Sequence, residues 1–489
     1  MLPTKLEGCT FDDVILRPQK GALASRRDPA RILTEMPLTR QLNIKVPIIA
    51  ANMDTVTEDR TAIAMAHEGG VAVLHRHCSV EKQVEWLGAV KRQHSHIIEH
   101  PIVIDGSATV REARQTMARH KVSGLLVVQH EKILVGTLSR RDMPEASDDV
   151  AVKEFMTPFD RLVWAEPDIS MADAERLMYE RRIEKLPLLV NGEVRGLITK
   201  GDIQFVKSHP YASRDAKGRL VVGAAIGSAP KDKWAASKNP LERAEALVAA
   251  GVDFIVVDIA HGHSTMLERV VREFRLKFGD FPLVGGNIAT YEGAKFLMEL
   301  GVDAIKIGVG PGFGCMTRLE TSFGVPQLQA IFEAQAAVRG RLPLIADGGL
   351  KHDGHIVLAI MAGASTVMVG GMLAGTDEAP GVEIPHPVTK QPMKEYRGMT
   401  SPQALLAQSD PDNAQEMLEE GQASEGRQEA VPLRGPVRKV IKRIHEHLCS
   451  AISYAGEETL LAAHRKISEK PFEYFVRLAP GARKESYER

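Results

Sequence analysis

The chain has 489 residues, which is too many for one compact domain and enough for two or three with full cores. Its 62 basic and 63 acidic residues nearly balance, which argues against a nucleic-acid-binding surface. Four scattered cysteines without CxxC spacing argue against a disulfide framework and a zinc site. No apolar run has membrane-spanning length and the first residues lack a signal-peptide pattern, so we expect a cytoplasmic protein without a membrane partner.

The first part of the chain, residues 1–93, begins with a loop-rich arm. It then predicts a buried strand at 46–51, a helix around 58–68 and a second strand at 70–75. Apolar strands separated by a helix are typical of a parallel sheet that helices cover.

Residues 94–206 have a different character, because two similar units of roughly sixty residues follow one another there. Each unit contains an amphipathic helix and ends in an apolar strand, a glycine, a short turn and an acid. The acid is Asp142 in the first unit and Asp202 in the second. The repeat therefore predicts a tandem module inserted into another domain.

The earlier pattern returns in residues 207–489, where strands and helices alternate and several strands end in polar or glycine-rich turns. Three helix-to-strand junctions share a glycine, Gly251, Gly301 and Gly363, that we expect to cap the preceding helix. The predicted strands of this part are 220–227, 254–262, 282–287, 304–312, 343–349 and 366–371.

Together the chain offers eight apolar strands that alternate with helices, which predicts an α/β fold, a closed (β/α)8 TIM barrel. A doubly wound open sheet is the alternative. Active sites of such barrels lie at the carboxyl ends of the strands. The residues at those ends are His75, Asp258, Asn287, Cys315, Asp347, Gly370 and Gly371.

The loop after the strand at 304–307 contains four glycines and ends at Cys315, with Thr317 two residues later. Glycines let the backbone approach a ligand closely, and a cysteine at the rim of such a loop is placed to attack an electrophile. A lone cysteine is more often a small buried apolar residue, and only the surrounding loop favours the nucleophile.

Two glycine pairs, Gly348-Gly349 after Asp347 and Gly370-Gly371, close the seventh and eighth strands. Either alone would be a tight turn, but two on adjacent strands favour an anion held by backbone N–H groups. Asp258 with His261 and His263 nearby invites a metal interpretation, yet no further ligand has suitable spacing. A surface for a sugar hydroxyl or an amide-bearing ring is the better interpretation.

Residues 400–424 are polar and contain five acids but no Arg, Lys, His or Tyr. The pattern predicts a surface segment or lid. Glu425, which follows it, becomes a candidate acid or base only if the segment folds back over Cys315.

At this point the sequence resembles the IMP dehydrogenase and GMP reductase family over nearly its whole length, and the inserted repeat resembles a tandem pair of CBS modules. Asp142 and Asp202 match the acids that hold a nucleotide ribose in such modules; an insert that only mediates assembly is the alternative. The motifs that carry the resemblance are TFDDVILRP (10–18), PIIAANMDTVT (47–57), DIAHGHS (258–264), GVGPGFGCMTR (308–318), ADGG (346–349), GGMLAGTDEAPG (370–381) and YRGM (396–399).

The resemblance implies that Cys315 attacks C2 of a purine nucleotide to form a covalent thioimidate, while Thr317 and Glu425 handle the proton. It also implies a monovalent cation, K+ among the candidates, on backbone carbonyls of Gly310, Gly312 and Cys315. Residues that match substrate contacts are Met53, Asn287, Asp347, Gly349, Gly370, Gly371, Tyr396, Gly398, Met399 and Gly426, and those that match cofactor contacts are Arg76, Asp258, Ala260 and His261.

Of the two activities, the resemblance favours reduction of GMP by NADPH, because residues 400–424 lack the Arg–Tyr pair with which dehydrogenases activate water. IMP dehydrogenase and a purine-nucleotide sensor without turnover are the alternatives. The family loop usually has Ser where this chain has Phe313, and reductases usually have Lys at Arg76. Relatives imply a homotetramer or octamer and adenine or guanine nucleotides on the CBS pair.

Overall fold

The computed structural model describes residues 6–21, 32–93, 97–98, 101–120, 122–130, 132–143, 148–228, 239–386, 388–404 and 424–487. These residues separate into two compact units. The larger contains the chain up to Lys91, Tyr211–Arg214 and the chain from Leu220 onward; the smaller contains Arg92–Pro210 and Asp215–Arg219.

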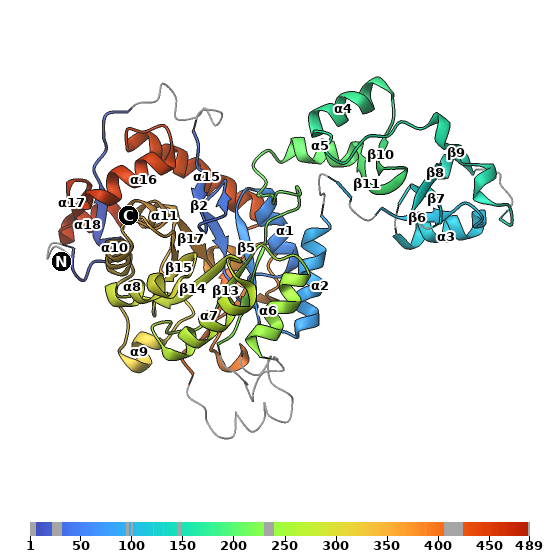
Figure 1. The fold of residues 1–489 in the computed structure, drawn as a ribbon. Coiled ribbons are helices and arrows are strands. Elements are labelled where there is room, and N and C mark those ends of the chain that lie inside the picture. The colour runs from blue at the N-terminus through green and yellow to red at the C-terminus, as the bar shows by residue number, and fades with distance from the viewer. Residues whose placement is uncertain are drawn as a thin grey trace. The chain divides into compact units, whose positions relative to one another are not determined.

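Eight parallel strands of the larger unit close into a barrel, which confirms the predicted TIM-barrel fold (Figure 1). Around the barrel the order is β12-β13-β14-β15-β16-β17-β4-β5, so the two strands that precede the repeat complete the ring. The strands are β4 (Ile48–Ala50), β5 (Val71–Leu74), β12 (Gly223–Ile226), β13 (Phe254–Val257), β14 (Leu283–Ile288), β15 (Ala304–Ile307), β16 (Leu344–Asp347) and β17 (Thr366–Val369).

Alternate residues of each strand face opposite sides, and both sides are buried. Ala304 of β15 and Ile345 of β16 belong to the cluster inside the barrel, whereas Ile305 and Leu344 pack under the surrounding helices. The same alternation puts Lys306 and Asp347 on the inner face at the carboxyl end of the barrel. Strands that are otherwise apolar and buried thus carry charged side chains at the end where the site lies.

Helices cover the outside of the barrel, and two of the predicted capping glycines follow them in left-handed backbone conformations. Gly251 has φ +88° and Gly301 has φ +87°, a region that residues with a Cβ rarely adopt. The helices are α1 (Asp59–His67), α2 (Val80–Lys91), α6 (Pro240–Ala249), α7 (Thr265–Phe278), α8 (Tyr291–Leu300), α9 (Thr317–Thr321), α10 (Gln327–Val338), α11 (Asp353–Ala362), α12 (Gly371–Ala374), α15 (Val437–Tyr454), α16 (Leu460–Glu469), α17 (Pro471–Tyr474) and α18 (Pro480–Tyr487).

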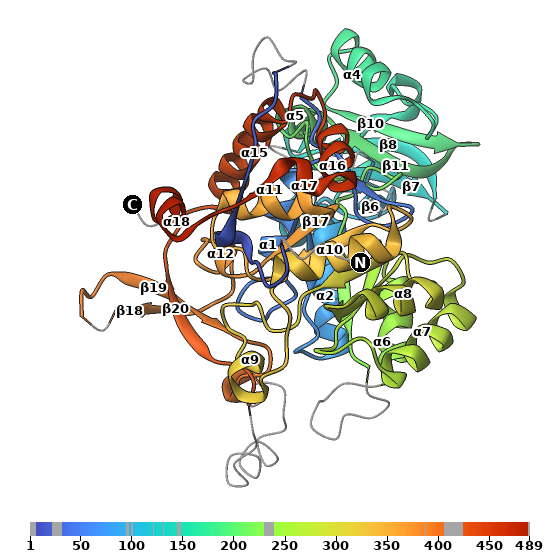
Figure 2. The ribbon, with the colours of Figure 1, turned by 90° about the vertical axis from the view of Figure 1, so that its left-hand side faces the viewer.

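Short strands outside the barrel join distant parts of the chain. Near the N-terminus, η1 (Phe11–Asp13) leads into β1 (Val14–Leu16), which pairs with β21 (Phe475–Arg477) close to α18, as Figure 2 shows. The hairpin β2 (Met36–Pro37) and β3 (Asn43–Ile44) and a three-stranded sheet complete the unit. That sheet contains β18 (Glu383–Pro385), β19 (Pro392–Arg397) and β20 (Gln428–Pro432).

The smaller unit repeats one arrangement twice, a helix followed by an antiparallel strand pair. The first copy has α3 (Val110–His120), β7 (Gly124–Gln129) and β8 (Ile133–Ser139), and the second has α4 (Met171–Glu180), β10 (Lys185–Val190) and β11 (Glu193–Thr199). Its remaining elements are β6 (Val103–Asp105), η2 (Arg140–Asp142), η3 (Val152–Glu154), β9 (Thr157–Pro158), η4 (Phe159–Arg161) and α5 (Lys200–Ser208). Among the described helices of the chain, none combines the length and apolarity needed to cross a bilayer.

Candidate functional site

A cavity of about 340 Å³ lies at the carboxyl ends of the barrel strands. The structure brings most of the sequence-predicted residues to its walls. They are Met53, Arg76, Asp258, Ala260, Asn287, Gly310, Gly312, Cys315, Thr317, Asp347, Gly349, Gly370, Gly371, Tyr396, Gly398, Met399 and Glu425.

Cys315, Thr317 and Glu425 form one hydrogen-bonded chain. The Cys315 thiol donates to Thr317 Oγ1 across 3.2 Å, and the Thr317 hydroxyl donates to Glu425 Oε2 across 2.6 Å. A thiol is thereby connected through a hydroxyl to a carboxylate. This is the connection that a residue needs to pass a proton to or from a group leaving the atom that sulfur attacks.

Backbone pairing explains how Glu425 reaches this position. Cys315 forms an isolated antiparallel bridge with Gly426. On either side of the bridge, the Met316 amide donates to the Glu425 carbonyl at 2.6 Å and the Arg427 amide donates to the Gly314 carbonyl at 3.0 Å. The condition on which the sequence made Glu425 a candidate, its return to Cys315, is therefore met. Gly426 lies behind Cys315 rather than on the cavity wall.

Most of the polar segment that precedes Glu425, residues 405–423, lies outside the described residues. Its two ends are joined, because the Ser424 hydroxyl donates to the Thr400 carbonyl across 2.6 Å. The ends of the predicted lid therefore meet directly beside the Cys315 loop.

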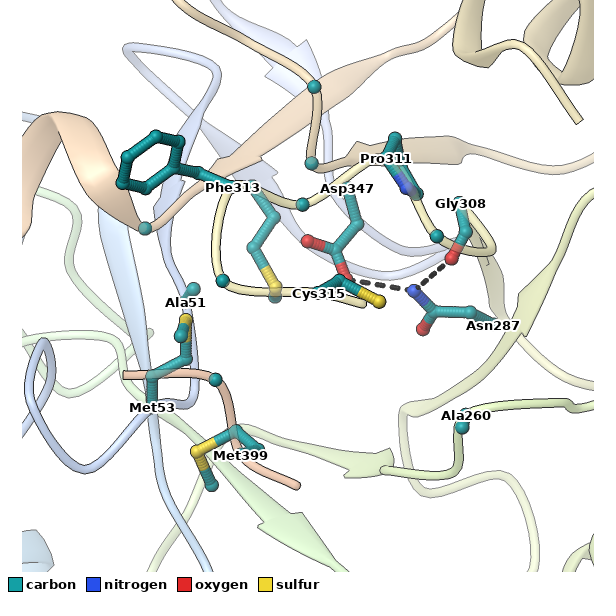
Figure 3. A pocket seen from close by; sticks show the side chains of 18 of the residues that line it. Ala51, Met53, Ala260, Asn287, Gly308, Pro311, Phe313, Cys315, Asp347 and Met399 are labelled. Atoms are coloured by element: carbon teal, nitrogen blue, oxygen red, sulfur yellow. Dashed lines mark hydrogen bonds between the residues drawn. The ribbon is translucent and has the colours of Figure 1, made fainter. Parts of the chain in front are cut away.

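A buried cation organises the floor of the cavity. Lys306 Nζ donates to Asp347 Oδ2 at 2.7 Å and lies 4.0 Å from Asp258 Oδ1. Asn287 Nδ2 donates both to Asp347 Oδ2 and to the Gly308 carbonyl (Figure 3). Burial opposes the charged amine, but the two carboxylates outweigh it and raise the pKa of Lys306. The network holds Asp347 in a single orientation toward the cavity.

Sequence analysis did not identify Lys306 as a site residue, although its signal was present. A lysine in the middle of a four-residue strand that is otherwise apolar is almost never fully buried unless it is paired. Gln327 was missed as well. Its side-chain amide donates to the carbonyls of Ile307 and Asp347, which ties α10 to the ends of β15 and β16.

The glycine pairs Gly348-Gly349 and Gly370-Gly371 leave their backbone open to a ligand at one corner of the cavity. Gly348 and Gly349 both have positive φ, +87° and +77°. A Cβ on Gly370 would lie 3.0 Å from Met53 Sδ and 3.1 Å from the Tyr396 hydroxyl, so a side chain there would crowd the wall. Tyr396 is buried, and burial chiefly, with the charges of Asp347 and Cys315, raises its pKa, so it presents a neutral hydroxyl.

Phe313, which breaks the expected loop pattern, lies at the edge of the cavity and is 54% exposed. Its ring stacks on Tyr396 with centroids 6.0 Å apart, and the Arg427 guanidinium lies 5.1 Å from its centroid. In Figure 3 the ring points away from Cys315 and Asp347. Phe313, Tyr396 and Arg427 therefore form an aromatic and cationic layer at the mouth of the cavity. The Phe313 ring offers no hydrogen-bond donor to a phosphate.

On the opposite side of Cys315, Arg76 Nε lies 3.3 Å from Asp258 Oδ2, and Ala260 completes that wall. His261 is exposed and does not line the cavity. The side-chain oxygen of Asn287 is buried without a hydrogen-bond partner among the described residues. An unpaired acceptor beside Asp258 fits a ligand that brings an amide or hydroxyl donor, as a nicotinamide nucleotide does.

The backbone carbonyls expected to hold a monovalent cation have other partners nearby. The Gly312 carbonyl accepts from the Cys315 amide at 3.0 Å. The Arg318 guanidinium donates to the Val309 and Val325 carbonyls and packs against Gly310. A cation at Gly310, Gly312 and Cys315 would therefore lie in the same loop as the positively charged Arg318 guanidinium.

The two acids of the repeat occupy equivalent positions in the smaller unit, each accepting at a helix start. Asp142 Oδ2 accepts from the Ser139 amide at 2.7 Å. Asp202 Oδ2 accepts from the Thr199 amide at 3.3 Å and from its hydroxyl at 2.5 Å. Both carboxylates thus close capping boxes, which fixes their orientation.

Comparison with known proteins gives consistent matches along the whole length. The model for the IMP dehydrogenase / GMP reductase domain matches residues 8–487. An inosine-5'-monophosphate dehydrogenase of Aquifex aeolicus is 40% identical over 98% of this chain and 95% of its own. A GMP reductase of Leishmania donovani is also 40% identical, over 99% of this chain and 97% of its own.

Among solved structures, a cysteine-to-alanine variant of GMP reductase from Trypanosoma brucei in complex with guanosine 5'-monophosphate superposes with a TM-score of 0.84. It is 38% identical, and the match covers 99% of this chain and 98% of that one. The same enzyme in complex with guanosine 5'-triphosphate gives a TM-score of 0.75 at 36% identity over 98% of both chains. A closed barrel with a cysteine-bearing glycine loop and full-length matches to both kinds of enzyme together establish that this chain belongs to the IMP dehydrogenase/GMP reductase family of oxidoreductases.

Proposed function

We propose that the protein is a GMP reductase that converts GMP to IMP and ammonia with NADPH. The observation that carries the proposal is the chain Cys315–Thr317–Glu425, which ends in a carboxylate 2.6 Å from the hydroxyl. Ammonia leaves easily only after its nitrogen is protonated, and a carboxylic acid connected through a hydroxyl can supply that proton.

The reaction begins when the Cys315 thiolate adds to C2 of the guanine ring. Glu425, through Thr317, delivers a proton to the 2-amino group, and the C–N bond breaks to release ammonia and leave a Cys315 thioimidate. NADPH supplies a hydride to C2 when it is bound. The C–S bond then breaks, its electron pair returns to Cys315, and IMP leaves. The balance is GMP + NADPH + H+ → IMP + NH3 + NADP+.

The other residues of the cavity bind and orient. Asp347, held by Lys306 and Asn287, faces the nucleotide ribose, while the backbone at Gly349, Gly370 and Gly371 and the neutral Tyr396 hydroxyl receive the phosphate. Met53, Gly398 and Met399 contact the base, and Gly426 positions Glu425 from behind. Arg76, Asp258 and Ala260 form the nicotinamide side. His261, outside the cavity, would contact only a part of the cofactor that extends beyond it.

The second candidate activity is that of IMP dehydrogenase, which the match to the Aquifex enzyme favours. It needs a base that activates water after hydride has left. Residues 400–424 contain neither Arg nor Tyr, and Arg397 is committed to Asp54 with Nη2–Oδ2 at 2.5 Å. The reductase needs no such base, so it remains the preferred assignment.

We also assign residues 94–206 as a tandem CBS regulatory domain, with the barrel formed by 1–93 and 207–489. Asp142 and Asp202 would each hold a ribose of an adenine or guanine nucleotide. A relative crystallised with guanosine 5'-triphosphate supports nucleotide binding by this family, and a homotetramer or octamer completes the assignment. K+ at Gly310, Gly312 and Cys315 would stabilise the loop while Cys315 changes between free and covalent states.

Nicotinamide absorbance with purified protein tests the assignment. GMP with NADPH should lose absorbance and release ammonia in equal amounts, and Cys315→Ser should abolish both. Formation of NADH from IMP and NAD, without turnover of GMP, would make the protein a dehydrogenase. Nucleotide binding that persists with no turnover of either pair would leave only the sensor.

A further inference from the structure

A cluster of potential metal ligands lies in the larger unit outside the catalytic cavity. Asp12 of η1, His352 and His355 offer three ligand atoms that all lie within 4.8 Å of one another. His355 belongs to α11, and His352 is the residue immediately before that helix. Two imidazoles with one carboxylate are a ligand set that first-row divalent metals, Zn2+ in particular, bind well.

The contact between Asp12 and His355 is close but is not a hydrogen bond. His355 Nε2 lies 3.0 Å from Asp12 Oδ1, yet the atom is buried and has no hydrogen-bond partner among the described residues. The His355 side chain is only 1% exposed. Ligand atoms about 2 Å from a shared Zn2+ lie roughly 3.3 Å apart and aim at the metal rather than at each other. The Asp12–His355 contact fits that arrangement better than a direct bond.

The remaining atoms of the cluster are already oriented. Asp12 Oδ2 accepts from Lys351 Nζ at 2.7 Å, which leaves Oδ1 as the oxygen that faces the histidine. The Lys351 amide lies 3.3 Å from the other ring nitrogen of His355, Nδ1, and on the opposite side of the ring Nε2 faces Asp12.

The third ligand is positioned to close the site. The His352 ring lies over His355, with centroids 3.7 Å apart, and Tyr487 of α18 stacks on His352 at 5.7 Å. His352 is exposed and also lines a second cavity of about 690 Å³, from which a hydrated ion can enter. Phe11 packs against His355 on the inner side, with ring centroids 5.2 Å apart.

We propose that Asp12, His352 and His355 bind one Zn2+ ion, with water from the second cavity as the fourth ligand. The ion connects η1 to the start of α11, which follows the Asp347-Gly348-Gly349 turn of the catalytic cavity. It acts as a clamp between the N-terminal segment and the barrel. Its role is structural and independent of whether the enzyme reduces GMP or oxidises IMP.

Zinc titration of the full-length, metal-stripped protein by calorimetry tests the site. The experiment uses the Cys315→Ser background, so that the thiol of the catalytic loop cannot contribute a ligand. We expect one saturable equivalent of Zn2+ and a thermal midpoint that rises until one equivalent is bound. His352→Gln, at an exposed position, should abolish both effects without changing the midpoint of the metal-free protein.

The matched control is His120→Gln, which removes an exposed histidine at the end of α3 and should leave binding unchanged. Asp12→Asn should lose the site in the same way as His352→Gln. Co2+ provides a second readout, because its visible spectrum should show imidazole and oxygen coordination only while His352 is present. Absence of a one-equivalent site, or binding that His352→Gln leaves unchanged, overturns the proposal.

Discussion

Thr317 and Glu425 are 108 positions apart in the chain, yet the hydroxyl of one donates to the carboxylate of the other across 2.6 Å. The bond completes a path from the Cys315 thiol to an acid at the cavity wall. Two segments outside the barrel strands, the glycine loop and the residues just before β20, meet to make this bond. We propose that the Cys315 end attacks the substrate and the Glu425 end moves the proton, so a substitution at Glu425 alone tests the second role.

Glu425→Gln should slow ammonia release by about 10²- to 10⁴-fold, because the amide keeps the shape of the side chain but cannot supply the proton. The KM for GMP should change little, since nucleotide contacts remain. Single-turnover measurement of ammonia provides the test. Glu429→Gln is the matched control, because this glutamate of β20 pairs with Arg427 just before the strand and does not line the cavity. Equal rates for Glu425→Gln and the parent would contradict the path.

Lys306→Met should destabilise the larger unit by about 1–3 kcal/mol, because it leaves the partly buried Asp347 carboxylate without its cation, while Asp258 keeps Arg76. Nucleotide affinity should fall too, since Asp347 loses its orientation. Denaturation midpoints and GMP binding measure the two effects. The double variant Lys306→Met with Asp347→Asn should recover part of the stability but not the binding. Recovery of both would show that Lys306 does not position Asp347.

Phe313→Ser should lower the KM for the nucleotide, because the serine hydroxyl adds a phosphate donor at the loop. The loss of the contact with Arg427 costs about 0.5–1 kcal/mol, so the thermal midpoint should change only slightly. Steady-state kinetics at several GMP concentrations provide the test. Phe323→Ser, which removes another exposed ring shortly after α9, serves as the control. A higher KM would instead assign the aromatic ring itself to substrate binding.

Stability should decrease as the pH falls below about 6.5. Burial chiefly, with Arg76 and His75 nearby, lowers the pKa of His77 to about 2. An unfolded histidine takes up a proton near pH 6.5 that the folded one refuses, so acid favours the unfolded state. Thermal midpoints at about pH 7.5 and about pH 5.5 measure the difference. His77→Gln should reduce this pH dependence, and an unchanged difference would exclude His77 as a cause.

The barrel could be predicted because its strands are apolar on both faces and two of the junctions that lead into them carry a glycine with positive φ, as at Gly301. Strand ends were predicted too long, for example 304–312 against Ala304–Ile307, because a strand ends where its residues turn to line the cavity. Glycines and polar residues after a buried run mark the site but do not mark the last paired residue.

The site itself was only partly within reach of the sequence. Asp347 ends β16 and Cys315 follows β15, so the barrel fold alone brings them together. Glu425 reaches them through backbone pairing at Gly426, for which no local pattern exists. His261 is close to Asp258 in the sequence, yet it is exposed and does not line the cavity, so its role as a cofactor contact stays a prediction. Direction after a strand end depends on tertiary contacts rather than on neighbouring residues.

The hydrogen bond between Ser424 and Thr400 closes the chain between them into a loop that can be exchanged without moving the Cys315 loop. Because both ends of the intervening stretch are fastened to each other and to the Cys315 loop, its length and composition can change at a cost that grows only slowly with length. Grafting a dehydrogenase stretch carrying an Arg–Tyr pair between Thr400 and Ser424 would leave Glu425 where it is. One scaffold can thus accept different segments between Thr400 and Ser424 while the backbone pairing that holds Glu425 beside Cys315 stays unchanged.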